Sequence, residues 1–184
     1  MYERIAKLRE ECFDSYEKTQ DDKYLRKAYS IDVFFECKVY KKYQKFTKFC
    51  KENGFDRVFD IGCAFGFQSE VFLETGVSYV GINEDNIDFW NKDVFKYIAK
   101  HYPFEIKARD TDLAVSSLCL AWNCYLYEGE KTLKEQCEAL SRDFKSCLLY
   151  IPNDKIEFVS SFFKKTIVLQ EDTIGSLVYF TNKK

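Results

Sequence analysis

Residues 60–66 read Asp-Ile-Gly-Cys-Ala-Phe-Gly and join an apolar run to an apparent helix. The two glycines allow the backbone to turn tightly and to approach a ligand, and the small residues between them keep side chains out of its way. Free amides at the start of the next helix favour an anionic group such as a carboxylate. The segment therefore predicts a turn that holds a small molecule. The residues expected around that ligand are Asp60, Gly62, Cys63, Ala64, Phe65 and Gly66.

The pattern along the chain predicts the elements that position this turn. Through residues 1–53 apolar residues recur at three- and four-residue spacing, which predicts helices, with a polar stretch at 18–32 that is either a short helix or a loop. From residue 54 short apolar runs alternate with helical periods, which predicts a mostly parallel sheet covered on both faces. Strands are expected at 57–61, 78–82, 104–108, 113–117, 146–151, 165–170 and 176–181, and helices at 66–76, 87–98, 133–144 and 155–161.

The last two predicted strands are joined by a turn so short that they must be antiparallel neighbours. We therefore expect an α/β protein with a seven-stranded, mostly parallel sheet, a C-terminal antiparallel hairpin and additional N-terminal helices. With 184 residues and no stretch rich in Pro, Gly or Ser, the chain is expected to form a single domain. Residues 1–53 would be a helical cap on an α/β core at 54–184.

Charge and composition argue against several classes of function. The net charge is -2 and the basic residues are spread along the chain, so no nucleic-acid surface is expected. No apolar stretch approaches the roughly 20 residues that cross a bilayer, and the N-terminus is charged, so we expect a cytoplasmic protein with no membrane partner. The eight cysteines are scattered singly and His101 is the one histidine, so no metal site is expected.

The segment "VFDIGCAFG" resembles the first motif of class I S-adenosylmethionine-dependent methyltransferases, which have a Rossmann-like fold. In that family an acidic residue and a spacer precede Gly-x-Gly-x-Gly. Asp60, Gly62 and Gly66 match this form, and Ala64 replaces the middle glycine. The resemblance covers about residues 55–181 and includes the closing hairpin.

Two other nucleotide-binding motifs fit less well. A dinucleotide oxidoreductase, the close competitor, wants a third glycine where this chain has Phe67, and it does not normally end in such a hairpin. A phosphate-binding Walker loop is absent, since no Gly-Lys-Ser/Thr follows the turn.

The resemblance implies which residues would bind S-adenosylmethionine. Asp60 would orient the turn and reach toward the methionine ammonium, while backbone from Gly62 to Gly66 would line the cofactor. Asn83 stands where the family usually has an acidic residue for the ribose hydroxyls, with Glu84 next to it. An amide keeps a hydrogen bond to a hydroxyl but loses the stronger charge-assisted contact.

Further cofactor contacts are implied after the third and fourth strands. Asp110 matches the site that contacts adenine, with Ile82 and Ala108 as apolar neighbours. The link from the third to the fourth strand is much shorter than is usual in the family, which makes Asp112 an alternative to Asp110. Ser117 lies at the position of the family's fourth-strand motif.

The acceptor is expected to be a small molecule. Adenine-N methyltransferases usually carry Asn/Asp-Pro-Pro-aromatic after the fourth strand, where this chain reads "SSLCLAWNCYLYE". The segment looks more like small-molecule methyltransferases, in which a Leu-His-Trp type sequence often occurs, with Ala121 in place of the histidine. The residues expected to contact the substrate are Trp122, Tyr29 and Tyr125.

Methyl transfer from an activated sulfonium needs alignment and exclusion of water more than a fixed set of catalytic groups. The sequence accordingly assigns no catalytic residue. His101 is expected to be a favourable charge at a helix end, with a remote general base as the alternative. Two functions remain open: an active methyltransferase, or a methyltransferase-like module with weak or absent activity that acts as a binding or regulatory partner. The oligomeric state is not predicted.

Overall fold

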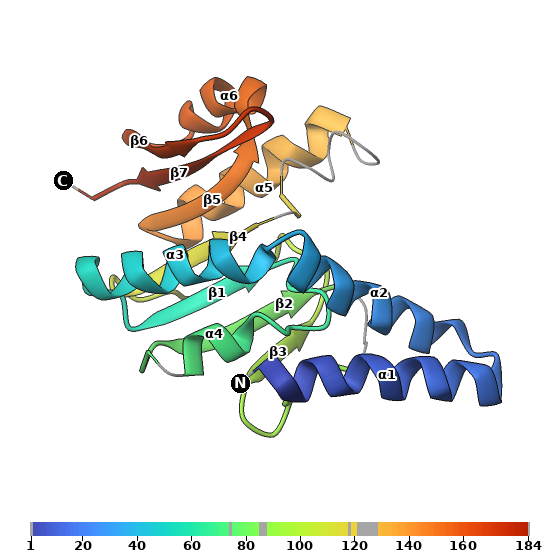
Figure 1. Ribbon diagram of the computed structural model, residues 1–184. Coiled ribbons are helices and arrows are strands. Elements are labelled where there is room, and N and C mark those ends of the chain that lie inside the picture. Colours follow the sequence, from blue (N-terminus) through green and yellow to red (C-terminus); the bar gives the residue numbers. More distant parts are fainter. Residues whose placement is uncertain (1, 74, 85–87, 118, 121–128, 184) are drawn as a thin grey trace.

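The computed structural model describes residues 2–73, 75–84, 88–117, 119–120 and 129–183, and Figure 1 shows their arrangement. The helices are α1 (Tyr2–Thr19), α2 (Asp22–Glu36), α3 (Val39–Asn53), α4 (Ser69–Leu73), α5 (Gly129–Asp143) and α6 (Ile156–Ser160), with a 3-10 turn η2 (Asn153–Lys155). The strands are β1 (Arg57–Ile61), β2 (Ser78–Asn83), β3 (Lys96–Ala99), β4 (Asp112–Ser116), β5 (Ser146–Pro152), β6 (Lys165–Glu171) and β7 (Gly175–Thr181).

The seven strands form one sheet in the order β3-β2-β1-β4-β5-β7-β6. The first five are parallel, and β7 lies antiparallel between β5 and β6. This arrangement confirms the predicted Rossmann-like α/β class and its C-terminal antiparallel hairpin. The chain order reverses at β1, because β2 lies on one side of it and β4 on the other, so the end of β1 is a topological switch point.

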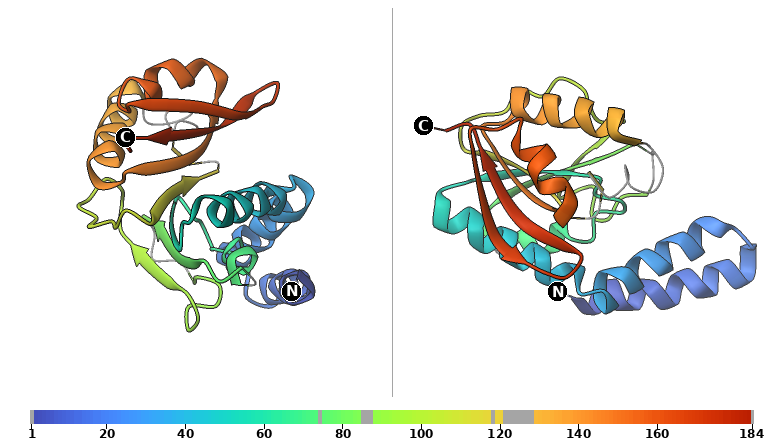
Figure 2. Two further views of the ribbon diagram at one scale, coloured as in Figure 1. Left: turned by 90° about the vertical axis from the view of Figure 1, so that its left-hand side faces the viewer. Right: turned by 90° about the horizontal axis from the view of Figure 1, so that it is seen from above.

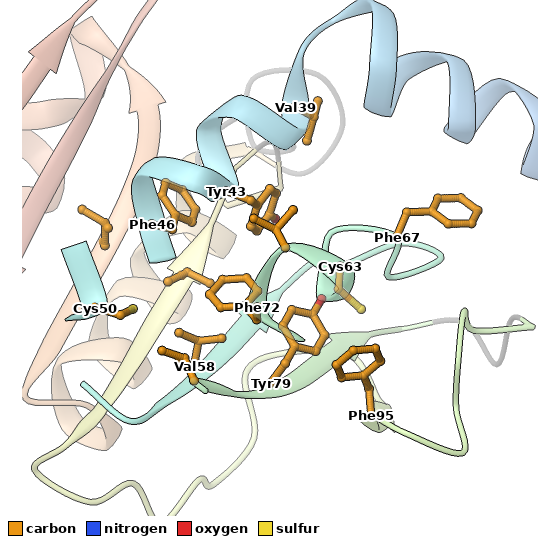
Figure 3. Close-up of a cluster of buried hydrophobic side chains, with 14 of the residues drawn as sticks. Val39, Tyr43, Phe46, Cys50, Val58, Cys63, Phe67, Phe72, Tyr79 and Phe95 are labelled. Carbon is orange, nitrogen blue, oxygen red and sulfur yellow. The ribbon is translucent and has the colours of Figure 1, made fainter. Parts of the chain in front are cut away.

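Alternate residues of the strands fill two apolar layers, as the period of two requires. On one face Val58 of β1 packs with Phe46 of α3 and Phe72 of α4, and Figure 3 shows this cluster. On the other face Phe59 of β1 packs with Phe144, which follows α5. The sheet is therefore covered on both sides, which leaves the ends of its strands as the place for a ligand.

Helices α1 and α2 form an antiparallel pair that extends away from the sheet (Figure 2, right). The polar stretch at 18–32 is mostly helical: α2 begins after Asp21, whose side chain caps the helix by accepting a hydrogen bond from the Lys23 amide at 3.0 Å. The base of the pair is anchored in the core by Ile5 of α1 and Ile31 of α2, both fully buried.

The predicted helix at 87–98 is wrong in its described part, and so is the strand at 104–108. Residues 96–99 form β3 instead, paired in parallel with β2, and 104–108 is irregular. The ring of Tyr97 stacks on Phe89 with centroids 4.4 Å apart, and Asn91 has a positive φ of 48°, which breaks a helix. Helix α4 is also shorter than the predicted 66–76.

Within the described residues, no helix is both long and apolar enough to cross a membrane.

Candidate functional site

The turn after β1 is held by hydrogen bonds from its own amides. Gly62 and Cys63 both donate to the carbonyl of Ile82, at 2.8 and 3.0 Å. Ala64 donates to the side-chain oxygen of Asn83 at 3.2 Å, and Gly66 donates to the carbonyl of Cys63 at 2.9 Å. These four amides already have acceptors inside the protein. The expected set of free amides for an anion is therefore not present at these four positions.

The glycines of the turn are required for close packing of the protein itself. Gly62 has a φ of 77°, and a Cβ there would overlap the side chain of Cys119. Gly66 has a φ of 79°, and a Cβ there would lie 2.5 Å from the hydroxyl of Tyr97. The hydroxyl of Tyr97 donates a hydrogen bond to the carbonyl of Trp90 at 2.7 Å, which holds the ring of Tyr97 against the turn. Both glycines thus allow a side chain to approach where a ligand was expected.

Asp60 is fully buried at the end of β1 and lies among three hydrogen-bond donors. The hydroxyl of Tyr79 and the amide of Gln68 each donate to it at 2.7 Å, and the hydroxyl of Tyr43 donates at 2.9 Å. Figure 3 shows Tyr43 and Tyr79 in the core between α3 and the sheet. Burial raises the pKa of Asp60 to about 6, although these hydrogen bonds favour the carboxylate.

The Asp60 network orients the turn. The amide of Gln68 that donates to Asp60 also donates to the carbonyl of Cys63 at 2.8 Å. Asp60 therefore holds the turn through Gln68, as the resemblance implied. The oxygens of Asp60 that were predicted to face a methionine ammonium are buried and accept hydrogen bonds from Tyr43, Gln68 and Tyr79.

Asn83 and Glu84, at the end of β2, lie beside the end of β3. Nδ1 of His101 is 2.7 Å from a carboxylate oxygen of Glu84, and both side chains are more than half exposed. His101 follows β3, so the prediction that it lies at a helix end is wrong. Gly62, Asn83, Glu84, His101 and Cys119 line a small cavity of about 70 Å³, here called the edge cavity.

A larger cavity of about 740 Å³ lies between the α1–α2 pair and the turn. We call it the hairpin cavity; among its lining residues are Leu8, Cys12, Tyr24, Arg26, Ala64 and Phe65. Asn83 lines both cavities. The hairpin cavity falls within the roughly 300–1,000 Å³ of ordinary small-molecule sites. The edge cavity by itself is smaller than this, so a small molecule bound at this edge has to extend past Asn83 into the hairpin cavity.

Ser117, directly after β4, is buried, and its hydroxyl has no hydrogen-bond partner among the described residues. The preceding Ser116 is different, because its hydroxyl donates to the carbonyl of Ile61 at 2.9 Å. A buried hydroxyl without a partner is costly, so Ser117 is a candidate contact for a ligand at this edge.

The structure does not bring Asp110 or Asp112 to the turn. Asp110 precedes β4 and Asp112 is its first residue. Both therefore lie at the end of the strands opposite to the one that carries residues 62–66. Asp110 is exposed and pairs with Lys145 at 2.7 Å. Asp112 is buried and accepts hydrogen bonds from the side chains of Arg57 and Arg109. Residues 109–112 therefore carry a structural ion-pair cluster in place of an adenine contact. The prediction of a short link from the third to the fourth strand is wrong, because β3 ends at Ala99 and β4 begins at Asp112.

The predicted substrate residues are not brought together. Tyr29 is 58% exposed and contacts the ring of Phe13 edge-on. It is not among the described residues that line the hairpin cavity, where Tyr24 is found instead. Trp122 and Tyr125 lie outside the described residues.

Several solved structures that align with this chain are methyltransferases. The bifunctional kinase-methyltransferase WbdD aligns with a TM-score of 0.58 at 15% identity, over 81% of this chain and 40% of that chain. An S-adenosylmethionine-dependent methyltransferase from Clostridium acetobutylicum aligns with a TM-score of 0.54 at 17% identity, over 88% and 76%. The magnesium protoporphyrin IX methyltransferase ChlM of Synechocystis, solved with S-adenosylmethionine bound, aligns with a TM-score of 0.56 at 8% identity, over 78% and 79%.

This chain spans about two-fifths of the length of WbdD. No protein-family model matches the chain, and no curated protein matches it in sequence. The chain has the fold of class I S-adenosylmethionine-dependent methyltransferases, and at these identities the likeness extends to the fold alone.

Proposed function

We propose that this protein is an S-adenosylmethionine-dependent methyltransferase whose acceptor is a small molecule bound in the hairpin cavity. The observation that carries the proposal is the position of that cavity. It meets the Gly62–Gly66 turn and Asn83 at the topological switch point, where ligands of open α/β sheets bind. The net charge of -2 supports a small molecule over a nucleic acid as the acceptor.

The residues at this edge fit the chemistry of the cofactor. Asn83 and Glu84 supply polar groups for ribose hydroxyls, and the hydroxyl of Ser117 lacks a partner among the described residues. When bound, S-adenosylmethionine would supply an activated methyl group. The chain's own part would be to hold the acceptor in line and to exclude water, for which the α1–α2 pair beside the cavity is suited.

The proposed cofactor site is tested by comparing the affinity for S-adenosylhomocysteine of the wild type with that of Ser117→Ala. In Ser117→Ala the lost hydroxyl has no described protein partner, so stability should be unchanged or higher. If it donates to the cofactor, affinity should fall roughly threefold to tenfold, the value of one neutral hydrogen bond. Ser116→Ala is the matched control and should lower stability without lowering affinity. Equal affinities for the wild type and Ser117→Ala would remove Ser117 from the site.

A second candidate is a binding module that does not transfer methyl groups. It is favoured by the packing of Cys119 over Gly62 and by the four turn amides that already have acceptors. The same titration separates the two functions. Absence of binding to both S-adenosylmethionine and S-adenosylhomocysteine would favour the module.

A further inference from the structure

The charged groups around the hairpin cavity are not evenly paired. Of the described residues that line it, three are basic and two are acidic, although the whole chain carries a net charge of -2. The basic residues are Lys23, Arg26 and Lys27, which α2 carries within five consecutive positions. The described part of the cavity wall is therefore more positive than the protein as a whole.

Two of these cations are held by neighbouring carboxylates. Lys27 pairs with Asp88 at 2.7 Å, and its side chain is only 13% exposed. This hydrogen bond holds the pKa of Asp88 below its usual value. Lys23 pairs with Asp21 at 2.8 Å. Arg26 differs, because it is exposed and no hydrogen bond or ion pair joins it to a described residue, although its charge helps to lower the pKa of Asp21, after the hydrogen bonds from Lys23.

The acidic side chains of the wall are, in contrast, matched by cations. Asp88 is approached by Lys92 at 3.7 Å as well as by Lys27. Glu11 on α1 is 3.7 Å from Lys7, one helical turn away. An incoming cation would have to compete with these lysines, whereas an incoming anion would find the guanidinium of Arg26 available.

The rest of the wall is suited to an apolar body. Leu8 and Cys12 of α1 and Phe65 of the turn line the cavity, and Tyr24 adds a second aromatic ring. Cys12 is almost fully buried, and burial raises the pKa of its thiol, so it presents a neutral surface. The cavity combines this surface with a guanidinium, whose planar fork matches a carboxylate or a phosphate.

We propose that the hairpin cavity binds a small aromatic or apolar anion, a carboxylate or a phosphate ester, whose charged group pairs with Arg26. As an assignment of the acceptor class, this inference rests on the proposed methyltransferase function. As an assignment of ligand chemistry, it is tested without the cofactor.

Ligand-observed NMR titration of the full chain with four small probes tests the inference. Benzoate and phenyl phosphate are the anionic probes. Benzamide, which is neutral, and benzamidine, which is cationic, resemble benzoate in shape and serve as controls. A hydrogen bond to a charged group is worth about 1.5–3 kcal/mol, so one or both anions should bind about 10- to 100-fold more tightly than benzamide. Benzoate binding more tightly than phenyl phosphate would indicate a carboxylate, and the reverse a phosphate.

Two variants locate the binding. Arg26→Met should reduce the preference for the anion at least tenfold, and because Arg26 is exposed the variant should fold like the wild type. Lys18→Met removes an exposed cation from the same helix pair outside the cavity and should leave the preference unchanged. The inference is overturned if benzamidine or benzamide binds as tightly as the anions, if no probe binds, or if Arg26→Met retains the full preference. Binding of S-adenosylmethionine, measured separately, decides the methyltransferase function whichever result is obtained.

Discussion

Replacing Asp60 by asparagine should change how the stability of this protein depends on pH. The pKa of Asp60 is about 6 in the folded protein, against an ordinary value of 3.8. The folded state therefore binds the proton more tightly than the unfolded state does. Between about pH 4 and pH 6 it carries more protons than the unfolded chain, so the free energy of unfolding falls as pH rises and levels off above about pH 6.

The size of the effect follows from the two pKa values. A tenfold difference in proton affinity is worth about 1.4 kcal/mol, so the whole shift is worth about 3 kcal/mol. About 2 kcal/mol of this is lost between pH 4 and pH 7, because the unfolded chain is already partly protonated at pH 4. In Asp60→Asn the side chain is neutral at every pH and keeps an acceptor for Tyr79 and Gln68. The free energy of unfolding of the variant relative to the wild type should therefore rise by about 2 kcal/mol between pH 4 and pH 7.

Urea unfolding of both proteins, followed by circular dichroism at a series of pH values, measures this difference. Comparing the two proteins cancels the contributions of the other carboxylates to the pH dependence. One of these is Asp112, whose pKa is lowered, so the stability that it contributes is lost as the pH falls below its ordinary pKa. Asp110→Asn is a control at an exposed carboxylate, with an expected effect under about 1 kcal/mol. A stability difference between Asp60→Asn and the wild type that does not vary with pH would refute the reasoning.

Two further predictions concern stability and are measured by the same urea unfolding. Gly66→Ala should lower the free energy of unfolding by about 2–4 kcal/mol, because the left-handed backbone is strained for alanine and the new Cβ meets Tyr97. Gly76→Ala is the control: its φ is similar but the space around it is open, so it should cost about 1 kcal/mol. Equal costs would show that Tyr97 does not press on the turn. Asp112→Asn should cost about 3–5 kcal/mol, since the guanidinium of Arg57 loses its buried partner; a loss under about 1 kcal/mol would contradict the assigned pairing.

The sequence predicted most of the fold because burial imposes a clear period on it. The apolar runs at 57–61 and 146–151 could only be buried strands, and the short turn before 176–181 required an antiparallel pair. The helix predicted at 87–98 is wrong in its described part, although Trp90, Val94 and Ile98 are spaced like one face of a helix. The four residues at 96–99 show no strand alternation, and their pairing with β2 makes them a strand.

The candidate site was less predictable because its contacts join distant parts of the chain. The carbonyl of Ile82 and the side chain of Asn83 accept the turn amides from about 20 positions away. Cys119, which follows β4 in the chain, lies against Gly62. No local pattern records such contacts. The alternation of small residues in the turn predicted a close approach, but not whether the approaching group is a ligand or a side chain.

The edge of the sheet beyond β1 and β2 is the proposed cofactor site, and calorimetric titration of the full chain with S-adenosylmethionine and S-adenosylhomocysteine tests it most directly. We expect both ligands to bind saturably at micromolar concentration, with one molecule bound per chain. Absence of heat with either ligand, together with an unchanged melting temperature, would contradict it.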